Sequence, residues 1–315
     1  LTFLSPLTLC AFATAQLPQP ADAQPLFTEL GQGIGANGIA VSESAGVVEI
    51  VTTTSSVLFS SRASESWSIL RHNSQTGTYD QVFSVESVAP PFGYVGLAGG
   101  ELAVRPGPEI ALHRRERFFD SIEIWNQANR ELLRTIKIPR AEPSLQCADV
   151  DADGVDDLIY YARPSFRLFP GIVVLSGATL EPLWDYRGPT TPSFEIGQID
   201  SDPALEVVLP NGWFLDGATG IPESIKNDDR RLSQYLVDLD GDGIDEWVQS
   251  LQTNAGRRGI QAREVLTGTI RWEVSLRSSG APEVVGAAVA DFDQDGALEI
   301  ALGVKDSTFP VQVLD

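Results

Sequence analysis

The sequence lacks several of the residues from which common functional sites are built. Its 315 residues include two cysteines, two histidines and no methionine. Two cysteines are too few for a disulfide scaffold, and two histidines argue against a His-rich metal site or a catalytic triad. Because methionine is missing even at position 1, we expect one or both ends of the natural chain to extend beyond this sequence.

Positive charge is scarce as well. The chain has 22 Lys and Arg residues against 43 Asp and Glu residues, which gives a net charge of −21. Nucleic acids and anionic membranes bind proteins through basic surfaces, so this balance argues against both as partners. The hydrophobic share of 43% is enough for a sizeable core, which excludes an acidic disordered tail. We therefore expect a globular protein, monomeric and without a membrane span.

The first 15 residues are uncharged and mostly apolar. They end in Ala13-Thr14-Ala15, a pattern of small residues that a signal peptidase accepts, so we predict cleavage before Gln16. The segment is too short for a membrane span of about 20 residues; a buried first strand is the alternative. Cleavage would leave Cys147 as the single cysteine of a secreted, periplasmic or cell-surface protein without an internal disulfide.

An acidic segment recurs along the chain. Three copies read D-x-D-x-D-G-x-x-[DE] before an apolar run, and they begin at Asp149, Asp238 and Asp291. A fourth copy, from Gln198, has Pro203 in place of the glycine, and two weaker copies keep mainly the last acid. The last acids of the six copies are Glu49, Glu109, Asp157, Glu206, Glu246 and Glu299. Their average spacing of roughly 50 residues indicates a repeat architecture.

Each repeat reads as four strands. Glycine and threonine-rich turns, flanked by apolar runs that are typical of hairpins, lie between the acidic segments. Four antiparallel strands in about 50 residues are typical of a propeller blade. We predict an all-β fold, a β-propeller over residues 16–315, with six blades, or seven if the C-terminus is truncated. Residues near Leu26–Leu30 are predicted to complete the last blade.

The acidic segments have the chemistry of a calcium loop. Asp side chains at positions 1, 3 and 5 turn toward one point, glycine at position 6 allows a sharp bend, and the acid at position 9 closes the cage. Zinc would require cysteine or histidine ligands, and an EF-hand would require a glutamate at position 12, which is absent. We predict three structural Ca²⁺ sites, and none in the Glu49 and Glu109 repeats. A weaker fourth set consists of Gln198, Asp200, Asp202 and Glu206.

These loops, each followed by an apolar strand at this period, resemble the FG-GAP / VCBS repeats of the integrin α-subunit propeller and of many secreted bacterial proteins. The resemblance covers roughly residues 26–315. It implies side-chain ligands at Asp149, Asp151, Asp153 and Asp157; at Asp238, Asp240, Asp242 and Glu246; and at Asp291, Asp293, Asp295 and Glu299. It also implies a backbone carbonyl ligand at position 7, from Val155, Ile244 and Ala297. The family includes adhesion proteins and enzymes.

Basic and aromatic residues gather in the segments predicted at the other edge of the blades. These segments connect the second strand to the third and one blade to the next. The predicted ligand-binding residues are Arg114, Arg115, Phe118, Phe119, Arg163, Phe166, Arg167 and Tyr94, accompanied by Arg117, Arg187, Arg257, Arg258 and Phe92. Such a surface recognises carboxylates, sugars or a protein partner; ordinary solvated loops are the alternative.

The predicted function follows from these two edges. We expect a non-catalytic binding or adhesion module that recognises a protein or glycan. The alternative is an extracellular enzyme, a lyase or hydrolase acting on polysaccharide, on the same scaffold. A GxGxxG match at Gly33–Gly38 precedes a strand-like run instead of a helix, which argues against a dinucleotide site. The two histidines lie in different predicted blades, which argues against a triad.

Overall fold

The computed structural model describes residues 33–44, 47–55, 66–86, 93–104, 107–163, 171–188, 194–209, 213–224, 234–252, 258–275, 283–290, 299–305 and 311–314. The predicted signal sequence at residues 1–15 and the predicted closing strand near Leu26–Leu30 lie outside the described residues.

Successive strands pair antiparallel in sequence order and form separate sheets. Sheet 1 contains β1 (Gly33–Ser44), β2 (Val47–Ser55), β3 (Ser66–Asn73) and β4 (Thr78–Glu86). Sheet 2 contains β5 (Gly93–Gly100), β6 (Glu109–Arg115), β7 (Asp120–Asn126) and β8 (Leu132–Ile138). Sheet 3 contains β9 (Ala141–Ala148), β10 (Asp157–Ala162), β11 (Gly171–Leu175) and β12 (Pro182–Arg187). Sheet 4 contains β13 (Glu195–Gly197), β14 (Glu206–Val208), β15 (Trp213–Leu215) and β16 (Pro222–Ser224). Sheet 5 contains β17 (Gln234–Val237), β18 (Glu246–Gln252), β19 (Arg258–Glu264) and β20 (Ile270–Ser275). The described part of sheet 6 contains β21 (Glu283–Ala290), β22 (Glu299–Lys305) and β23 (Val311–Leu314).

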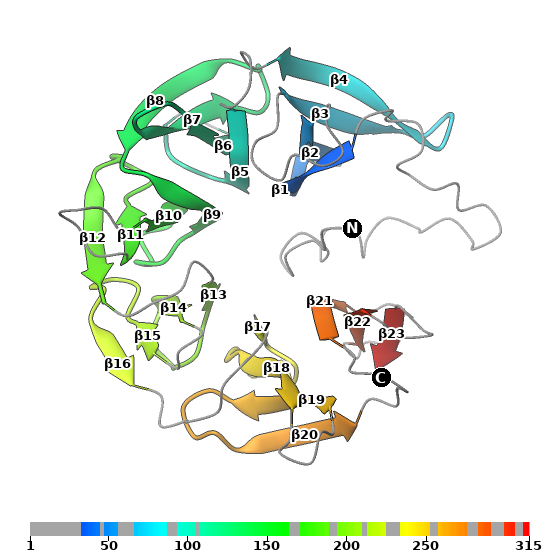
Figure 1. Ribbon diagram of the computed structural model, residues 1–315, viewed down its shortest axis with the longest axis vertical. Helices are drawn as coiled ribbons and strands as arrows, with labels where there is room; N and C mark the ends of the chain where they lie inside the picture. Colours follow the sequence, from blue (N-terminus) through cyan, green and yellow to red (C-terminus); the bar gives the residue numbers. More distant parts are fainter. Residues whose placement is uncertain are drawn as a thin grey trace.

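The sheets are arranged in a ring (Figure 1). The first strand of each sheet lies nearest the centre, and the fourth strand, where it is described, lies at the outer edge. The prediction of an all-β propeller is therefore confirmed. The total number of blades stays a prediction.

Burial along the strands follows their position in the ring. The inner and middle strands β5, β10 and β11 are almost completely buried, because neighbouring sheets cover both of their faces. The outer strands β8 and β12 are largely exposed or half-buried. Near-continuous apolar runs are typical of strands covered on both faces, and the runs GYVGLA in β5 and GIVVL in β11 fit this position.

Hydrophobic clusters join each sheet to the next from sheet 1 to sheet 5. Between sheets 1 and 2, the rings of Trp67 and Trp125 lie 5.2 Å apart at 67°, and Phe83 packs against both. Burial of each Val, Leu or Ile side chain in such a cluster contributes about 1.5–3 kcal/mol. The clusters between the following sheets pair Ile122 with Leu158, Ile159 with Val207, and Val208 with Trp247. Packing between sheets therefore stabilises the ring.

The turn between the third and fourth strands has the same backbone in sheets 1 to 5. Its fifth residue has a left-handed φ and donates its N–H to the carbonyl of the first residue. The fifth residues are Gly77, Arg130, Leu180, Gly220 and Gly268, with φ of 71, 64, 62, 68 and 71°. A Cβ on Gly220 would lie 2.6 Å from Trp184 of the preceding sheet. This turn thus packs against its neighbour.

The fourth strand contains a β-bulge in four of the described sheets. In each case one residue has no partner in the ladder to the third strand; it lies three positions after the left-handed turn residue in sheets 2, 3 and 5 and five positions after it in sheet 1. The bulged residues are Val82, Leu133, Leu183 and Arg271. A bulge changes the direction in which a side chain points, so these four side chains leave the regular alternation of the strand.

Candidate metal centres and the opposite edge

Acidic loops connect the first two strands of sheets 3, 4 and 5. They lie at the same edge as the third-to-fourth-strand turns, because the strands alternate in direction. Each loop brings three carboxylates together, with their oxygens within 4.8 Å of one another. The three groups are Asp149, Asp151 and Asp157; Asp200, Asp202 and Glu206; and Asp238, Asp240 and Glu246. The structure thus brings together the ligands predicted at positions 3 and 9 of all three loops.

Backbone N–H groups hold the acids of the Asp238 loop in place. The Asp238 carboxylate accepts from Asp242 at 3.2 Å and from Gly243 at 2.9 Å. The Asp242 carboxylate accepts from Ile244 at 2.9 Å. Gly243 has a φ of 90°, which favours glycine at position 6. The Asp149 loop repeats this arrangement, including a φ of 91° at Gly154.

The acid at position 9 is the buried residue at which each loop ends. It is the first residue of the second strand, and it accepts the N–H of position 2. The N–O distances are 3.3 Å for Val150 to Asp157, 2.8 Å for Ile199 to Glu206 and 2.9 Å for Leu239 to Glu246. Glu109 accepts from Leu102 at 2.9 Å in the same way. This contact therefore persists even where the loop has lost its other acids.

Burial makes these carboxylates unfavourable as free anions. Burial, with repulsion from nearby carboxylates, raises the pKa of Asp157 to about 6 and that of Glu206 to about 7. It also raises the pKa of Glu246. Among the described residues, Glu206 Oε1 has no hydrogen-bond partner although the residue is only 1% exposed. A buried oxygen among other carboxylates fits a hard cation, and a donor set made only of oxygen fits Ca²⁺.

The Gln198 loop differs in its first residue. The Gln198 amide nitrogen donates to the carbonyl of Ala204 at 3.1 Å and to that of Asp202. Ala204 stands at position 7, whose carbonyl is an implied metal ligand in the three full repeats. An amide therefore occupies part of this loop's interior, although the carboxylates of Asp200 and Glu206 still converge.

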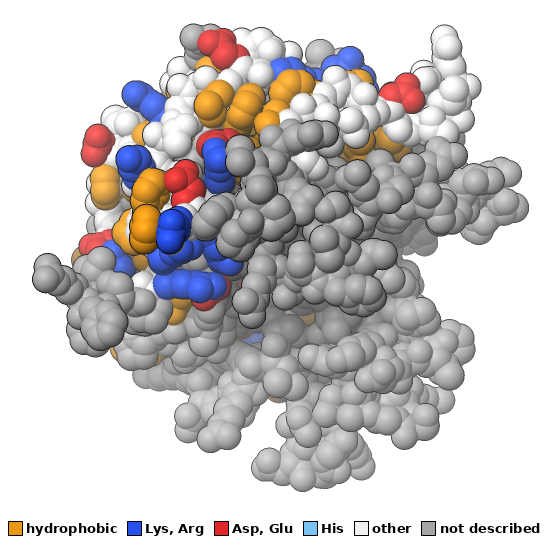
Figure 2. All heavy atoms as spheres, turned by 45° about the horizontal axis from the view of Figure 1, so that its top comes forward, with side chains coloured by type: hydrophobic (Ala, Val, Ile, Leu, Met, Phe, Trp, Pro, Cys, Tyr) orange, Lys and Arg blue, Asp and Glu red, His pale blue; other side chains and the backbone are white. Residues whose placement is uncertain are grey.

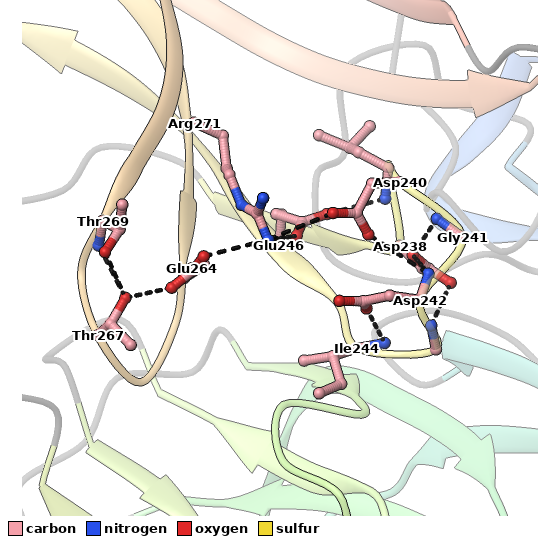
Figure 3. A network of polar contacts seen from close by, with 12 residues as sticks. Asp238, Asp240, Gly241, Asp242, Ile244, Glu246, Glu264, Thr267, Thr269 and Arg271 are labelled. Carbon is pink, nitrogen blue, oxygen red and sulfur yellow. Dashed lines mark hydrogen bonds and ion pairs between the residues drawn. The ribbon is translucent and has the colours of Figure 1, made fainter.

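The Asp238 loop has a basic neighbour (Figure 3). The Arg271 Nη2 atom lies 3.3 Å from Asp240 Oδ2, 3.9 Å from Glu246 Oε1 and 3.1 Å from Glu264 Oε1. One nitrogen thus contacts two predicted metal ligands and a third acid from the adjoining strand. Arg271 was not predicted from the sequence, because its place in the bulge is not visible in the repeat pattern.

Most of the third predicted loop lies outside the described residues. Asp291, Asp293 and Asp295 lie outside the described residues. Glu299 begins β22, but its side chain is also outside the description.

The first repeat neutralises its position-9 acid with protein groups. Glu49 is 5% exposed, and its carboxylate accepts hydrogen bonds of 2.7 Å from each of Arg71, Arg130 and Gln127. Burial raises its pKa, but these three side chains more than offset that effect and hold the pKa below its usual value. Arg130 comes from the turn of sheet 2, so this contact also joins two sheets.

Two acids at position 8 tie neighbouring sheets together. Asp156 Oδ2 accepts the N–H of Glu101 at 2.8 Å, and Asp245 Oδ2 accepts that of Gln198 at 2.9 Å. Each contact requires close approach of the backbone. A Cβ on the preceding residue, Gly100 or Gly197, would lie 2.9 or 2.2 Å from the respective carboxylate oxygen. The role of position 8 was not predicted, although in both repeats its aspartate is accompanied by a glycine just before position 1 of the preceding repeat.

Several predicted ligand-binding residues lie at the opposite edge of sheets 2 and 3. Arg115 ends β6, and Phe118 is 78% exposed in the following loop. The Arg140 guanidinium donates to Asp120 at 3.0 Å, and that of Arg163 pairs with Glu142. We call Arg115, Arg117, Phe118, Phe119, Arg140 and Arg163 the Arg-rich edge. Figure 2 shows Lys and Arg side chains close to hydrophobic ones on the described surface at the left of the view, where sheets 2 and 3 lie.

Tyr94 does not belong to this edge, which corrects its prediction as a ligand-binding residue. It lies in β5 instead of a connecting loop and is 3% exposed. Its hydroxyl donates to Glu123, which also accepts from Arg114 at 2.8 Å. Arg114 is therefore held by a buried carboxylate. Phe92, Phe166, Arg167 and Arg257 lie outside the described residues.

A buried polar contact between His113 and Asp120 lies next to the Arg-rich edge of sheet 2. His113 Nε2 lies 3.0 Å from Asp120 Oδ2, and the two side chains are 2% and 0% exposed. The same aspartate oxygen accepts the N–H of Ala141, the first residue of sheet 3. This cluster therefore links two sheets and is closed to a substrate.

Comparisons with known proteins support the architecture. No protein-family model matches the sequence, and neither does any curated protein. The crystal structure of the V. cholerae biofilm matrix protein Bap1 is 13% identical with a TM-score of 0.49, covering 90% of this chain and 61% of its own. The Dos1 propeller is 6% identical with a TM-score of 0.51, covering 87% and 66%. The Mitotic Checkpoint Complex contains a chain that is 10% identical with a TM-score of 0.52, covering 85% and 74%.

The latter two likenesses show the propeller fold alone. The chain spans less than two thirds of the length of the first two of these structures. In the described part of the chain, no helix is long and apolar enough to cross a membrane.

Proposed function

We propose that this chain is a secreted, calcium-stabilised β-propeller of the FG-GAP / VCBS type that binds a protein or glycan through its Arg-rich edge. One observation carries the calcium proposal. In sheets 3 and 4 the buried acids Asp157 and Glu206 converge with other carboxylates, and among the described residues they accept hydrogen bonds only from backbone N–H groups. A bound cation would neutralise them.

Calcium suits these loops better than the other common metals. Ca²⁺ takes six to eight oxygen ligands in flexible geometry, whereas Mg²⁺ requires a near-octahedral site. Zinc prefers cysteine and histidine, and the converging groups contain only carboxylates. In the Asp149 loop, Asp149, Asp151 and Asp157 would hold the ion and Asp153 would complete the cage.

The metal would stabilise the ring as well as a loop. Asp245 stands beside Glu246 and bonds to the backbone of Gln198 in the preceding sheet. Ordering one acidic loop therefore supports the contact between two sheets. A secreted protein without an internal disulfide gains its cross-links in this way.

Calcium titration tests this proposal directly. Isothermal titration of EDTA-treated full-length protein is expected to show two or more bound Ca²⁺ per chain. Millimolar Ca²⁺ is expected to raise the melting temperature, because the ion binds the folded state. The double variant D149N/D151N should lose one bound ion, whereas the matched control D185N, in an exposed acid of β12, should lose none. A protein that binds no calcium and melts alike in EDTA would overturn the proposal.

The Arg-rich edge supports the ligand proposal. It concentrates guanidinium groups in a protein whose net charge is −21. Burial and then the nearby charge of Arg163 lower the pKa of Arg115, with a further contribution from Arg140. An anionic group of a ligand would relieve this repulsion, and the exposed Phe118, next to the Arg117 guanidinium, offers an apolar contact. Guanidinium groups bind carboxylates and other oxyanions in a bidentate manner.

An array of acidic and neutral glycans and surface proteins tests the ligand proposal. The triple variant R115A/R117A/R163A is expected to remain folded and to lose at least about tenfold in retention. The matched control R134A removes an exposed arginine of the outer strand β8 and should bind as the wild type does. Equal retention of the triple variant and the wild type would exclude this edge as the binding surface.

A further inference from the structure

The bulge in β20 places a basic side chain beside an acidic loop. The equivalent bulged residues in sheets 2 and 3 are Leu133 and Leu183, which are apolar. In sheet 5 the residue is Arg271. The same backbone irregularity therefore presents an aliphatic group in sheet 3 and a guanidinium in sheet 5, although both sheets have a full acidic loop.

The guanidinium extends from β20 into the group of predicted ligands (Figure 3). Its Nη2 atom lies 3.3 Å from Asp240 Oδ2 and 3.9 Å from Glu246 Oε1. These acids stand at positions 3 and 9, and their oxygens converge with Asp238. A positive charge of the protein is thus close to the place where a divalent cation would bind.

Glu264 offers the guanidinium a second position. It lies opposite Glu246 in the ladder, and its Oε1 atom is 3.1 Å from Arg271 Nη2. The Thr267 hydroxyl donates to its other oxygen and lies 2.7 Å from Thr269 Oγ1. The turn therefore fixes a carboxylate that can keep the arginine when the loop carboxylates bind another cation.

We propose that Arg271 is a built-in competing cation of the Asp238 loop. A divalent ion and a guanidinium within a few ångströms repel each other, so calcium binds here only when the guanidinium leaves Asp240 and Glu246 and pairs with Glu264 alone. The inference depends on the proposed function of the loops. It gives the protein two classes of site: the Asp149 loop fills at low calcium, and the Asp238 loop fills only at higher calcium.

Calcium titration of two variants in matched backgrounds tests this proposal. In the first background, Asn replaces Asp149, Asp151, Asp200, Asp202, Asp291 and Asp293, so that only the Asp238 loop remains. In this background, R271L is expected to lower the calcium Kd about tenfold or more. R271K should leave the Kd near that of the same background with Arg271, because it keeps the charge. In EDTA, R271L should melt at a lower temperature, since the acids lose their internal counterion.

The second background is the reciprocal one and guards against misfolding of the first variant. It keeps the Asp149 loop intact and replaces Asp238 and Asp240 by Asn together with the acids of the other two loops. Here L183R is expected to raise the calcium Kd about tenfold or more. Far-UV circular dichroism in EDTA checks that each protein is folded.

The outcomes separate this inference from the proposed function. If the intact Asp149 loop binds calcium but R271L leaves the affinity of the Asp238 loop unchanged or weakens it, the inference is wrong and the calcium proposal stands. If neither loop binds calcium, both fail.

Discussion

Sheets 1 and 3 place a buried carboxylate at the same point, the position-9 residue of the repeat, and neutralise it differently. In sheet 1, Glu49 accepts hydrogen bonds from Arg71, Arg130 and Gln127, and its pKa lies below the usual value. In sheet 3, Asp157 accepts hydrogen bonds from backbone N–H groups within a loop of further carboxylates, and its pKa is raised to about 6. The first site carries its own cations, whereas among the described residues Asp157 has no cationic partner, and we propose that a metal ion supplies that charge.

The difference shows that the buried acid is the constant part of the repeat. It is retained in all six copies of the segment, while the preceding loop is reduced in two of them. In sheet 1, where the loop is reduced, Arg71 and Arg130 donate hydrogen bonds to the buried acid. Sheet 5 combines both devices, because its acidic loop is complete and Arg271 also lies beside it.

The double variant R71A/R130A breaks the first half of this comparison, and it is expected to have the largest effect. It leaves the buried Glu49 carboxylate without its two charged partners, so the free energy of unfolding should fall by about 3 kcal/mol or more. Urea denaturation in EDTA and in calcium should show the same loss, because no metal is involved. Adding E49Q should recover much of it. A loss that calcium restores would mean that sheet 1 also binds metal.

The pH dependence of the metal-free protein tests the second half of the comparison, the buried acid in the complete acidic loop. The expected change in the free energy of unfolding is similar to that of R71A/R130A or smaller. A carboxyl whose pKa is raised on folding contributes stability that is present below its unfolded pKa of about 4 and is lost as pH rises through the folded value. For Asp157 and Glu206 these folded values are about 6 and about 7. In EDTA, stability should therefore fall between about pH 4 and pH 7, by about 1–3 kcal/mol per group.

Calcium supplies the control for this measurement. Saturating calcium should remove most of the decline, since the bound ion favours the ionised carboxylates. The variant D157N should make the EDTA curve flatter by itself. A curve in EDTA that is as flat as the curve in calcium would show that these acids are not strained in the absence of metal.

The contact between sheets 4 and 5 offers the smallest test. A Cβ at position 197 would lie 2.2 Å from Asp245 Oδ2 and would push this carboxylate away from the N–H of Gln198. We expect G197A to lower the free energy of unfolding by about 1–3 kcal/mol. The control G77A removes a glycine with open space around it, and its cost should reflect its φ of 71° alone, about 1 kcal/mol. Chemical denaturation in saturating calcium compares the two.

The fold and the acidic loops were predictable because they are local and repeated. Three full copies of alternating aspartates before an apolar strand specify the loop without reference to any distant residue. The placements that failed or were missed depend on distant contacts. Tyr94 is buried in the cluster between sheets 1 and 2, and its hydroxyl donates to Glu123, 29 positions along the chain. Arg130 lies 81 positions from the carboxylate that it neutralises.

The sequence by itself determined the all-β propeller, the period of its repeats and the oxygen-rich chemistry of the loops. Each of these properties depends on residues that lie close together within one repeat. Only the tertiary structure decided which buried acids have a protein cation beside them. That outcome depends on the left-handed turn at Arg130 and the bulge at Arg271. Each of these features directs an arginine side chain toward a carboxylate that is distant in the sequence. The strength of an electrostatic interaction depends on the distance between the charges in space, which sequence spacing does not reveal.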